Sequence, residues 1–134
     1  MQGQLGDCWF LGIAAAIGEW SDRTKLIFKN SDYSDKASKN GVFEVKMWMY
    51  GREVKVVVDD RIFVKSDDRL MFARRDPHGA WWVPILEKAA AKFYGTYENL
   101  HFGLAENAIY ALTGMPSFKM DLSLYSVADT FERL

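Results

Sequence analysis

The chain has 134 residues and a formal net charge of -1, with 49% hydrophobic and 26% charged residues. This is the composition of a globular domain with a core of its own. The nearly balanced charge gives no electrostatic reason to expect nucleic acid or an anionic membrane as a partner. The single cysteine excludes an internal disulfide and fits a reducing compartment, so we expect a cytoplasmic protein. No apolar run reaches the roughly 20 residues of a membrane-spanning helix.

The first predicted element is a helix from about Cys8 to Glu19. Asp7 is a suitable N-cap, and the nearly uninterrupted apolar residues from Trp9 to Ile17 predict a helix enclosed on all sides. The only cysteine thus stands in the first turn, where N–H groups and a partial positive charge favour thiolate over thiol. Gln2 can add a side-chain N–H, beside the backbone N–H of Cys8, for the oxyanion of a tetrahedral intermediate. This layout predicts nucleophilic catalysis.

Two alternating segments farther along predict an antiparallel hairpin. In Val42–Tyr50 and in Glu53–Val58 the apolar residues fall on one face, and Gly51-Arg52 supplies the turn between them. A polar loop is predicted for Asn30–Asn40, before the hairpin. A third strand is expected near Leu70–Arg74.

The remaining elements are predicted to be helical. They are Arg23–Asn30 (a short helix or an irregular turn), Ile85–Tyr94 after Pro84, Leu104–Thr113, and a last helix that starts in Ser126-Val-Ala-Asp129. Gly95 and Gly114 fit the left-handed residue that follows a helix C-terminus. No stop signal follows the last helix before Leu134, so we expect this helix to be truncated.

Several segments resemble one enzyme family in the order in which they occur. The stretch Gln2-Gly-Gln-Leu-Gly-Asp-Cys-Trp9 is similar to the nucleophile motif of the calpain family of papain-like cysteine proteases. Val56-Val-Val-Asp-Asp-Arg61 and Leu86-Glu-Lys-Ala89 resemble segments that follow it, and the likeness extends over roughly residues 2–115. The resemblance implies an α+β fold: one papain-like lobe, the first of two in the protease core, formed by residues 1–134. It would have a central buried helix, several further helices and a small antiparallel sheet.

Carried over to this sequence, the resemblance implies Cys8 as the nucleophile and Gln2 as an oxyanion-hole donor. Trp9 would border the cleft. Gly103 would let the substrate backbone approach closely, although the family usually has two glycines there and this chain has Leu100-His101-Phe102-Gly103. The general-base histidine and its orienting asparagine lie in the family's second lobe, which this chain does not contain.

The resemblance also bears on metals and cofactors. It implies that calcium regulates the assembly of the two lobes, but the acidic calcium ligand that precedes the nucleophile motif would lie before Met1. We therefore assign no metal ligand in this chain, and the chemistry itself requires no cofactor.

Other candidate residues have simpler interpretations. His78 lies in a turn sequence and His101 is expected to be half-buried against Phe102, so neither is assigned as the base. Asp59-Asp60, next to Arg61, is interpreted as a salt-bridged strand end rather than an acid–base pair. Glu87 and Lys88 are expected to form the exposed stripe of their helix.

The predicted function is peptide-bond hydrolysis by a calpain-like cysteine endopeptidase that acts on protein substrates. This chain would be the nucleophile half and would be inactive without the second lobe. Two alternatives remain open. One is a catalytically silent calpain-like interaction or scaffold module, and the other is a thiol acyltransferase on the same scaffold.

Overall fold

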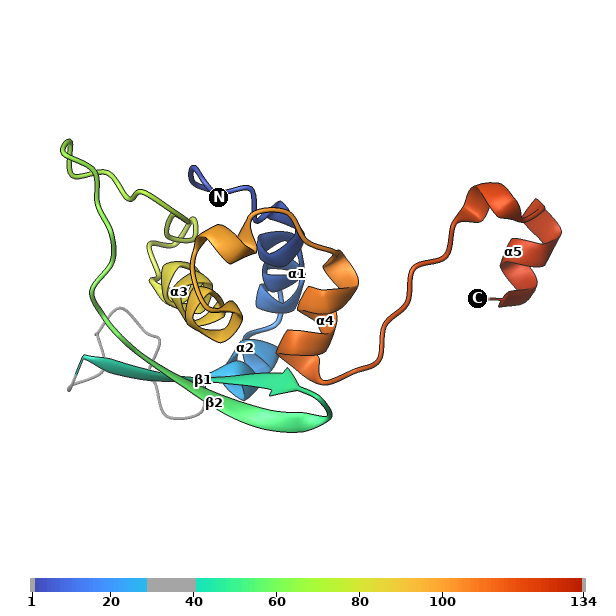
Figure 1. Cartoon of the computed structure of the whole chain (residues 1–134), viewed down its shortest axis with the longest axis horizontal. Helices are drawn as coiled ribbons and strands as arrows, with labels where there is room; N and C mark the ends of the chain where they lie inside the picture. The colour runs from blue at the N-terminus through green and yellow to red at the C-terminus, as the bar shows by residue number, and fades with distance from the viewer. Residues whose placement is uncertain (1, 29–40, 134) are drawn as a thin grey trace.

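The computed structural model describes residues 2–28 and 41–133 and confirms the α+β fold (Figure 1). In chain order the elements are α1 (Cys8–Gly18), α2 (Ser21–Ile27), β1 (Val42–Met49), β2 (Arg52–Asp59), α3 (Trp82–Tyr94), η1 (Glu98–Leu100), α4 (Ala105–Thr113), η2 (Leu122–Leu124) and α5 (Val127–Arg133). The helices α1, α3 and α4 lie together on one side of the hairpin, and α2 contacts both α1 and β1. The loop predicted for residues 30–40 lies outside the described residues.

The hydrophobic core lies between the hairpin and these helices. It includes Phe10 and Ala14 of α1, Phe43, Val45 and Met47 of β1, Val56 and Val58 of β2, Leu86, Ala89 and Ala90 of α3, and Ala108, Ala111 and Leu112 of α4. β1, β2, α3 and α4 each bury one face or stripe, as the sequence periodicity predicts. The core therefore joins segments from nearly the whole described chain up to α4.

The hairpin is confirmed. β1 and β2 are antiparallel, in a register that sets Val45 opposite Val56. The turn is formed by Tyr50 and Gly51, whose φ angles are 49° and 75°, one residue earlier than the predicted pair. Two successive positive φ angles are typical of the tight turns whose twist matches that of the strands.

The third strand predicted near Leu70–Arg74 is wrong. Within the described ranges, this stretch makes an isolated bridge between Val64 and Leu70 and no ladder. The backbone here contacts the N-terminal loop, since the N–H of Gln4 donates to the carbonyl of Met71 at 3.3 Å. Residues 71–73 thus support the segment that precedes α1.

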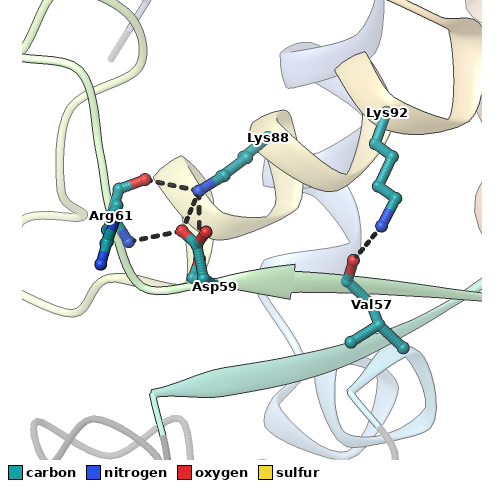
Figure 2. A network of polar contacts seen from close by, with 5 residues as sticks. All are labelled: Val57, Asp59, Arg61, Lys88 and Lys92. Carbon is teal, nitrogen blue, oxygen red and sulfur yellow. Dashed lines mark hydrogen bonds and ion pairs between the residues drawn. The ribbon is translucent and has the colours of Figure 1, made fainter.

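Two lysines of α3 bind β2 and the residues directly after it (Figure 2). Nζ of Lys92 donates to the carbonyl of Val57 at 2.6 Å, and Nζ of Lys88 donates to the carbonyl of Arg61 at 2.6 Å. The cation paired with Asp59 is Lys88 and not the predicted Arg61, which donates its backbone N–H at 2.9 Å. The hydrogen bond from Lys88 lowers the pKa of Asp59. These contacts occupy carbonyl groups that an edge strand otherwise leaves open.

Helix α1 begins where predicted, but it is not enclosed on all sides. Phe10 and Ala14 are buried, whereas Gly12, Ala15 and Ala16 are exposed. The helix packs against α3 and α4 with one side. Its other side presents small side chains to the surface, next to Cys8.

The helix ends marked by glycine are confirmed. Gly95 after α3 has a φ of 107°, and Gly114 after α4 has a φ of 72°, a backbone region that L residues rarely adopt. Pro84 lies in the first turn of α3, which begins two residues earlier than the proline, at Trp82.

Beyond Ser117, which still contacts α4, the chain up to residue 133 extends away from the rest of the structure (Figure 1). Ser126 caps α5 as predicted: its Oγ accepts the N–H of Asp129 at 3.2 Å and donates to the carboxylate of Asp129 at 2.6 Å. Between Asp121 and Glu132, every side chain that the structure describes is exposed. None of the helices in the described ranges is long and apolar enough to span a bilayer.

Candidate active site

Cys8 is the first residue of α1, and its side chain is exposed. The carbonyl of Asp7 accepts the N–H groups of Phe10 and Leu11 at 2.9 and 3.0 Å, which starts the helix. The N–H of Cys8 lies in the first turn, where N–H groups have no carbonyl acceptor within the helix, and at the positive end of the helix. The thiol is therefore accessible and stands beside an N–H group that can bind an oxyanion.

Cys8 and Gln2 line the same open cavity of about 700 Å³. The side-chain N–H of Gln2 donates to the carbonyl of Leu5. Since a carboxamide nitrogen carries two hydrogens, a second N–H remains for another acceptor. The structure thus brings together the two residues that the sequence predicts to act on one carbonyl group.

The same cavity is also lined by Asp76, Pro77, His78, Trp82 and Val83. The carboxylate of Asp76 accepts the N–H groups of His78 and Ala80 at 2.9 and 2.8 Å, and the indole N–H of Trp82 at 3.0 Å. Burial opposes ionisation of Asp76, but these hydrogen bonds outweigh it and lower the pKa of the carboxyl. One carboxylate therefore holds both the turn and the tryptophan that line the cavity together with Cys8.

Two hydrogen bonds hold the loop that precedes Cys8. The N–H of Gly6 donates to Nδ1 of His101 at 3.1 Å, and the N–H of Phe102 donates to the carbonyl of Gly6 at 3.0 Å. His101 is exposed rather than half-buried as predicted, although its ring lies 4.3 Å from that of Phe102. A contact between residues 95 positions apart has no signal in the sequence, so this role of His101 was missed.

Trp9 and Gly103 lie beside each other, and neither is among the residues that line the cavity next to Cys8. The indole N–H of Trp9 donates to the carbonyl of Leu100 at 2.9 Å. A Cβ atom on Gly103 would lie 2.3 Å from the Trp9 ring, so this position requires glycine for packing. The predicted contact of these two residues with substrate remains a prediction.

His78 is exposed and lines the cavity together with Cys8. It occupies the turn that the sequence predicts, and its backbone N–H is bonded to Asp76. In the part of the chain that the structure describes, no three His, Cys, Asp or Glu side chains are grouped so as to hold a metal ion. The calcium dependence that the resemblance implies remains a prediction.

Two carboxyl groups behind the nucleophile differ from their predicted roles. Asp7 occupies the N-cap position of α1, but its side chain makes no capping hydrogen bond and is fully buried. Glu87 is 1% exposed instead of belonging to the outer stripe of α3. The N-cap position of Asp7 is thus confirmed without a capping bond from its side chain, whereas the exposed stripe expected for Glu87 is wrong. Both side chains are buried among residues that are distant in sequence.

The comparisons with known proteins agree on one family. The model of the calpain family cysteine proteases matches residues 1–134. The calpain-type cysteine protease DEK1 of Zea mays is 40% identical over 121 residues, which is 90% of this chain and 5% of the relative. Calpain-12 of Homo sapiens is 38% identical over 114 residues, 84% of this chain and 15% of the relative. Calpain-5 of Caenorhabditis elegans is 35% identical over 116 residues, 84% of this chain and 18% of the relative.

Proposed function

The chain belongs to the calpain family of cysteine proteases, and we propose that it carries the nucleophile of a calpain-like cysteine endopeptidase, Cys8. The chain spans between 5% and 18% of the length of the three relatives described above. The activity of a complete protein, its protein substrates and its dependence on calcium are therefore part of this proposal.

One observation carries the proposal. An exposed thiol at the start of α1 shares an open cavity with the side chain of Gln2. A carbonyl group attacked by Cys8 at this place would find two N–H donors, one from the Gln2 side chain and one from the Cys8 backbone. This is the arrangement that acyl transfer through a thioester requires.

In the proposed reaction a histidine from a second lobe takes the proton of Cys8. The thiolate sulfur forms a bond to the carbonyl carbon of the scissile peptide, and the oxygen becomes an oxyanion held by the N–H groups of Gln2 and Cys8. Collapse of this intermediate breaks the C–N bond, and the leaving amine receives the proton from the histidine. Water, deprotonated by the same histidine, then attacks the thioester and releases the acid and the thiol.

The exposed side of α1 supports the participation of a second lobe. Gly12 and Ala15 line the cavity with Cys8, and both are exposed. Small side chains permit the close approach of another protein surface. A lobe seated on this side would close the cavity into a cleft and bring its histidine to the thiol.

The experiment is labelling with an epoxide inhibitor of papain-like enzymes, followed by mass spectrometry. We expect the 134-residue chain alone to react no faster than free cysteine, and the complete source protein to be labelled rapidly at Cys8. Cys8→Ser removes the label. Gln2→Ala reduces peptide hydrolysis by about 10²–10³-fold, while iodoacetamide still alkylates Cys8.

The alternatives give other results. A complete protein that neither hydrolyses a casein substrate nor is labelled at Cys8 contradicts the endopeptidase and supports a silent interaction module. Rapid labelling combined with acyl transfer to an amine, and no hydrolysis, supports the acyltransferase.

A further inference from the structure

Two carboxyl groups lie buried next to each other, directly behind the nucleophile. The exposed fraction is 0% for Asp7 and 1% for Glu87. Among the ion pairs of the described residues, neither group has a cationic partner; the neighbouring Lys88 is paired with Asp59 instead. Two adjacent buried carboxylates without a counter-ion would repel each other and lose their hydration, which is a strongly unfavourable state.

The hydrogen bonds around the pair indicate how this state is avoided. The N–H of Ala73 donates to both carboxyl oxygens of Glu87, at 3.1 and 2.9 Å. Within the described part of the chain, both oxygens of Asp7 lack a hydrogen-bond donor. An ionised carboxylate is an acceptor only, whereas a protonated one is also a donor. A proton on Glu87 would therefore supply the donor that Asp7 lacks.

The electrostatic surroundings favour a proton on Glu87. Burial, assisted by the adjacent Asp7 carboxyl, raises the pKa of Glu87 to about 8, against the opposing effect of the Ala73 N–H. Burial also raises the pKa of Asp7, against smaller opposing effects of Glu87, the Asp7 backbone N–H and the Gln2 side chain, none of which forms a hydrogen bond of normal length to the Asp7 oxygens. Tyr97 is the other titratable neighbour, and burial and the Glu87 charge raise its pKa, so its phenol stays neutral.

The pair connects three segments at the site. Asp7 immediately precedes Cys8, and Glu87 belongs to α3. Ala73 continues the stretch on which the N-terminal loop rests: a Cβ on Gly3 would lie 2.1 Å from the carbonyl oxygen of Phe72. A displacement of Glu87 would therefore shift the loop in two ways, through Asp7 and through the stretch at residues 72–73.

We propose that Asp7 and Glu87 share one proton in the folded protein and, as a positioning pair, hold the loop that carries Gln2 and Cys8. The positioning role rests on the proposed function of Cys8, whereas the shared proton does not. A divalent cation between the two carboxyls is the competing arrangement. The N–H of Ala73, which donates to both oxygens of Glu87, disfavours it.

The first test is the pH dependence of unfolding. A carboxyl whose pKa is higher in the folded state stabilises the fold fully below its unfolded pKa, and this stabilisation is lost as the pH rises toward the folded pKa. For Glu87 that window runs from 4.5 to about 8. We expect the unfolding equilibrium constant of the unmodified chain to rise by at least about tenfold between roughly pH 5 and 8. Glu87→Gln, which keeps one donor and one acceptor, should remove this rise.

Glu98→Gln is the matched control. Glu98 is exposed and its pKa is lowered by hydrogen bonds, so its titration lies below this window and the slope should stay unchanged. A slope in Glu87→Gln equal to that of the unmodified chain would overturn the shared proton. The shared proton would also be overturned if millimolar Ca²⁺ stabilised the unmodified chain and Glu87→Gln abolished this stabilisation. The pair would then hold a cation.

Infrared difference spectroscopy on the unmodified chain covers the case in which a variant does not fold. We expect the C=O stretch of a protonated buried carboxyl at neutral pH, and its loss as the pH passes about 8. Absence of this band at neutral pH contradicts the proposal. Cys8→Ala should leave the band in place, so this result is independent of the role of Cys8.

Amide exchange tests the positioning role. The N–H groups of Gly6 and Phe102 report on the two bonds that hold the loop. We expect Glu87→Ala to accelerate their exchange by at least about tenfold, and Glu87→Gln to keep it within about threefold. In the complete protein, epoxide labelling of Cys8 should slow in Glu87→Ala and recover in Glu87→Gln. Unchanged exchange in Glu87→Ala would overturn the positioning role even if the proton is shared.

Discussion

Gly6 and Gly12 lie only six positions apart, in opposite environments. A Cβ on Gly6 would lie 2.7 Å from Nδ1 of His101, whereas nothing lies within 4 Å of a Cβ on Gly12. Since Nδ1 accepts the N–H of Gly6, the ring cannot withdraw without losing that hydrogen bond. We expect Gly6→Ala to lower the free energy of unfolding by about 1–3 kcal/mol. Gly12→Ala should raise it by about 0.5–1 kcal/mol, because alanine is the better helix former.

Urea denaturation followed by tryptophan fluorescence measures both changes. The two variants add the same methyl group, so the difference between them isolates the surroundings of each glycine. Equal effects of the two substitutions would show that His101 does not confine the loop before Cys8.

At the scale of elements, the sequence predicted correctly those features that are determined by residues close together in the chain. The alternation of the hairpin and the stops at Gly95 and Gly114 are local signals, and the structure confirms them. The burial of Glu87 depends on Asp7, which is 80 positions away, and on an N–H group from a stretch that looked like a strand. Its place in the helix gave no sign of this, because a charged residue between apolar ones is typical of an exposed stripe.

The same limit applies to the candidate site. The motif from Gln2 to Trp9 predicted that Cys8 starts a helix, with Gln2 close to it, and the structure places both on one cavity. The supports of that motif come from residues 71–73, Glu87 and His101. A single sequence contains no signal for contacts at such separations.

Lys92 provides a test of how α3 supports the hairpin. Its Nζ donates to the carbonyl of Val57 on the outer edge of β2 at 2.6 Å (Figure 2). Lys92→Met keeps the apolar stem and removes the donor. We expect the free energy of unfolding to fall by about 1 kcal/mol, with faster amide exchange in β2.

Lys119→Met is the control for this variant, because Lys119 is an exposed lysine after α4. Its effect should stay within about 0.5 kcal/mol. Urea denaturation measures both variants. If they have the same effect, the ammonium of Lys92 does not contribute to the attachment of β2.

At the scale of the whole molecule, the described chain has a packed part and an extended part. The core ends with α4. After α4, Ser117 still contacts this helix: its Oγ donates to the carbonyl of Glu106 at 2.7 Å. Beyond Met120, exposed apolar side chains such as those of Leu124 and Phe131, 75% and 76% exposed, bury little surface against the core.

Removal of the residues after Met120 should therefore leave the packed part intact. We expect the free energy of unfolding to change by less than about 0.5 kcal/mol, because none of the removed side chains that the structure describes is buried and the bond of Ser117 is retained. A shorter chain that ends at Gly114 loses this bond as well and should be less stable by about 1 kcal/mol. Urea denaturation of the full chain and of the chains that end at Met120 and at Gly114 measures the two losses of stability separately. A loss above about 1 kcal/mol in the first deletion would mean that α5 packs against the core in solution, and that the separation in Figure 1 is not its stable arrangement.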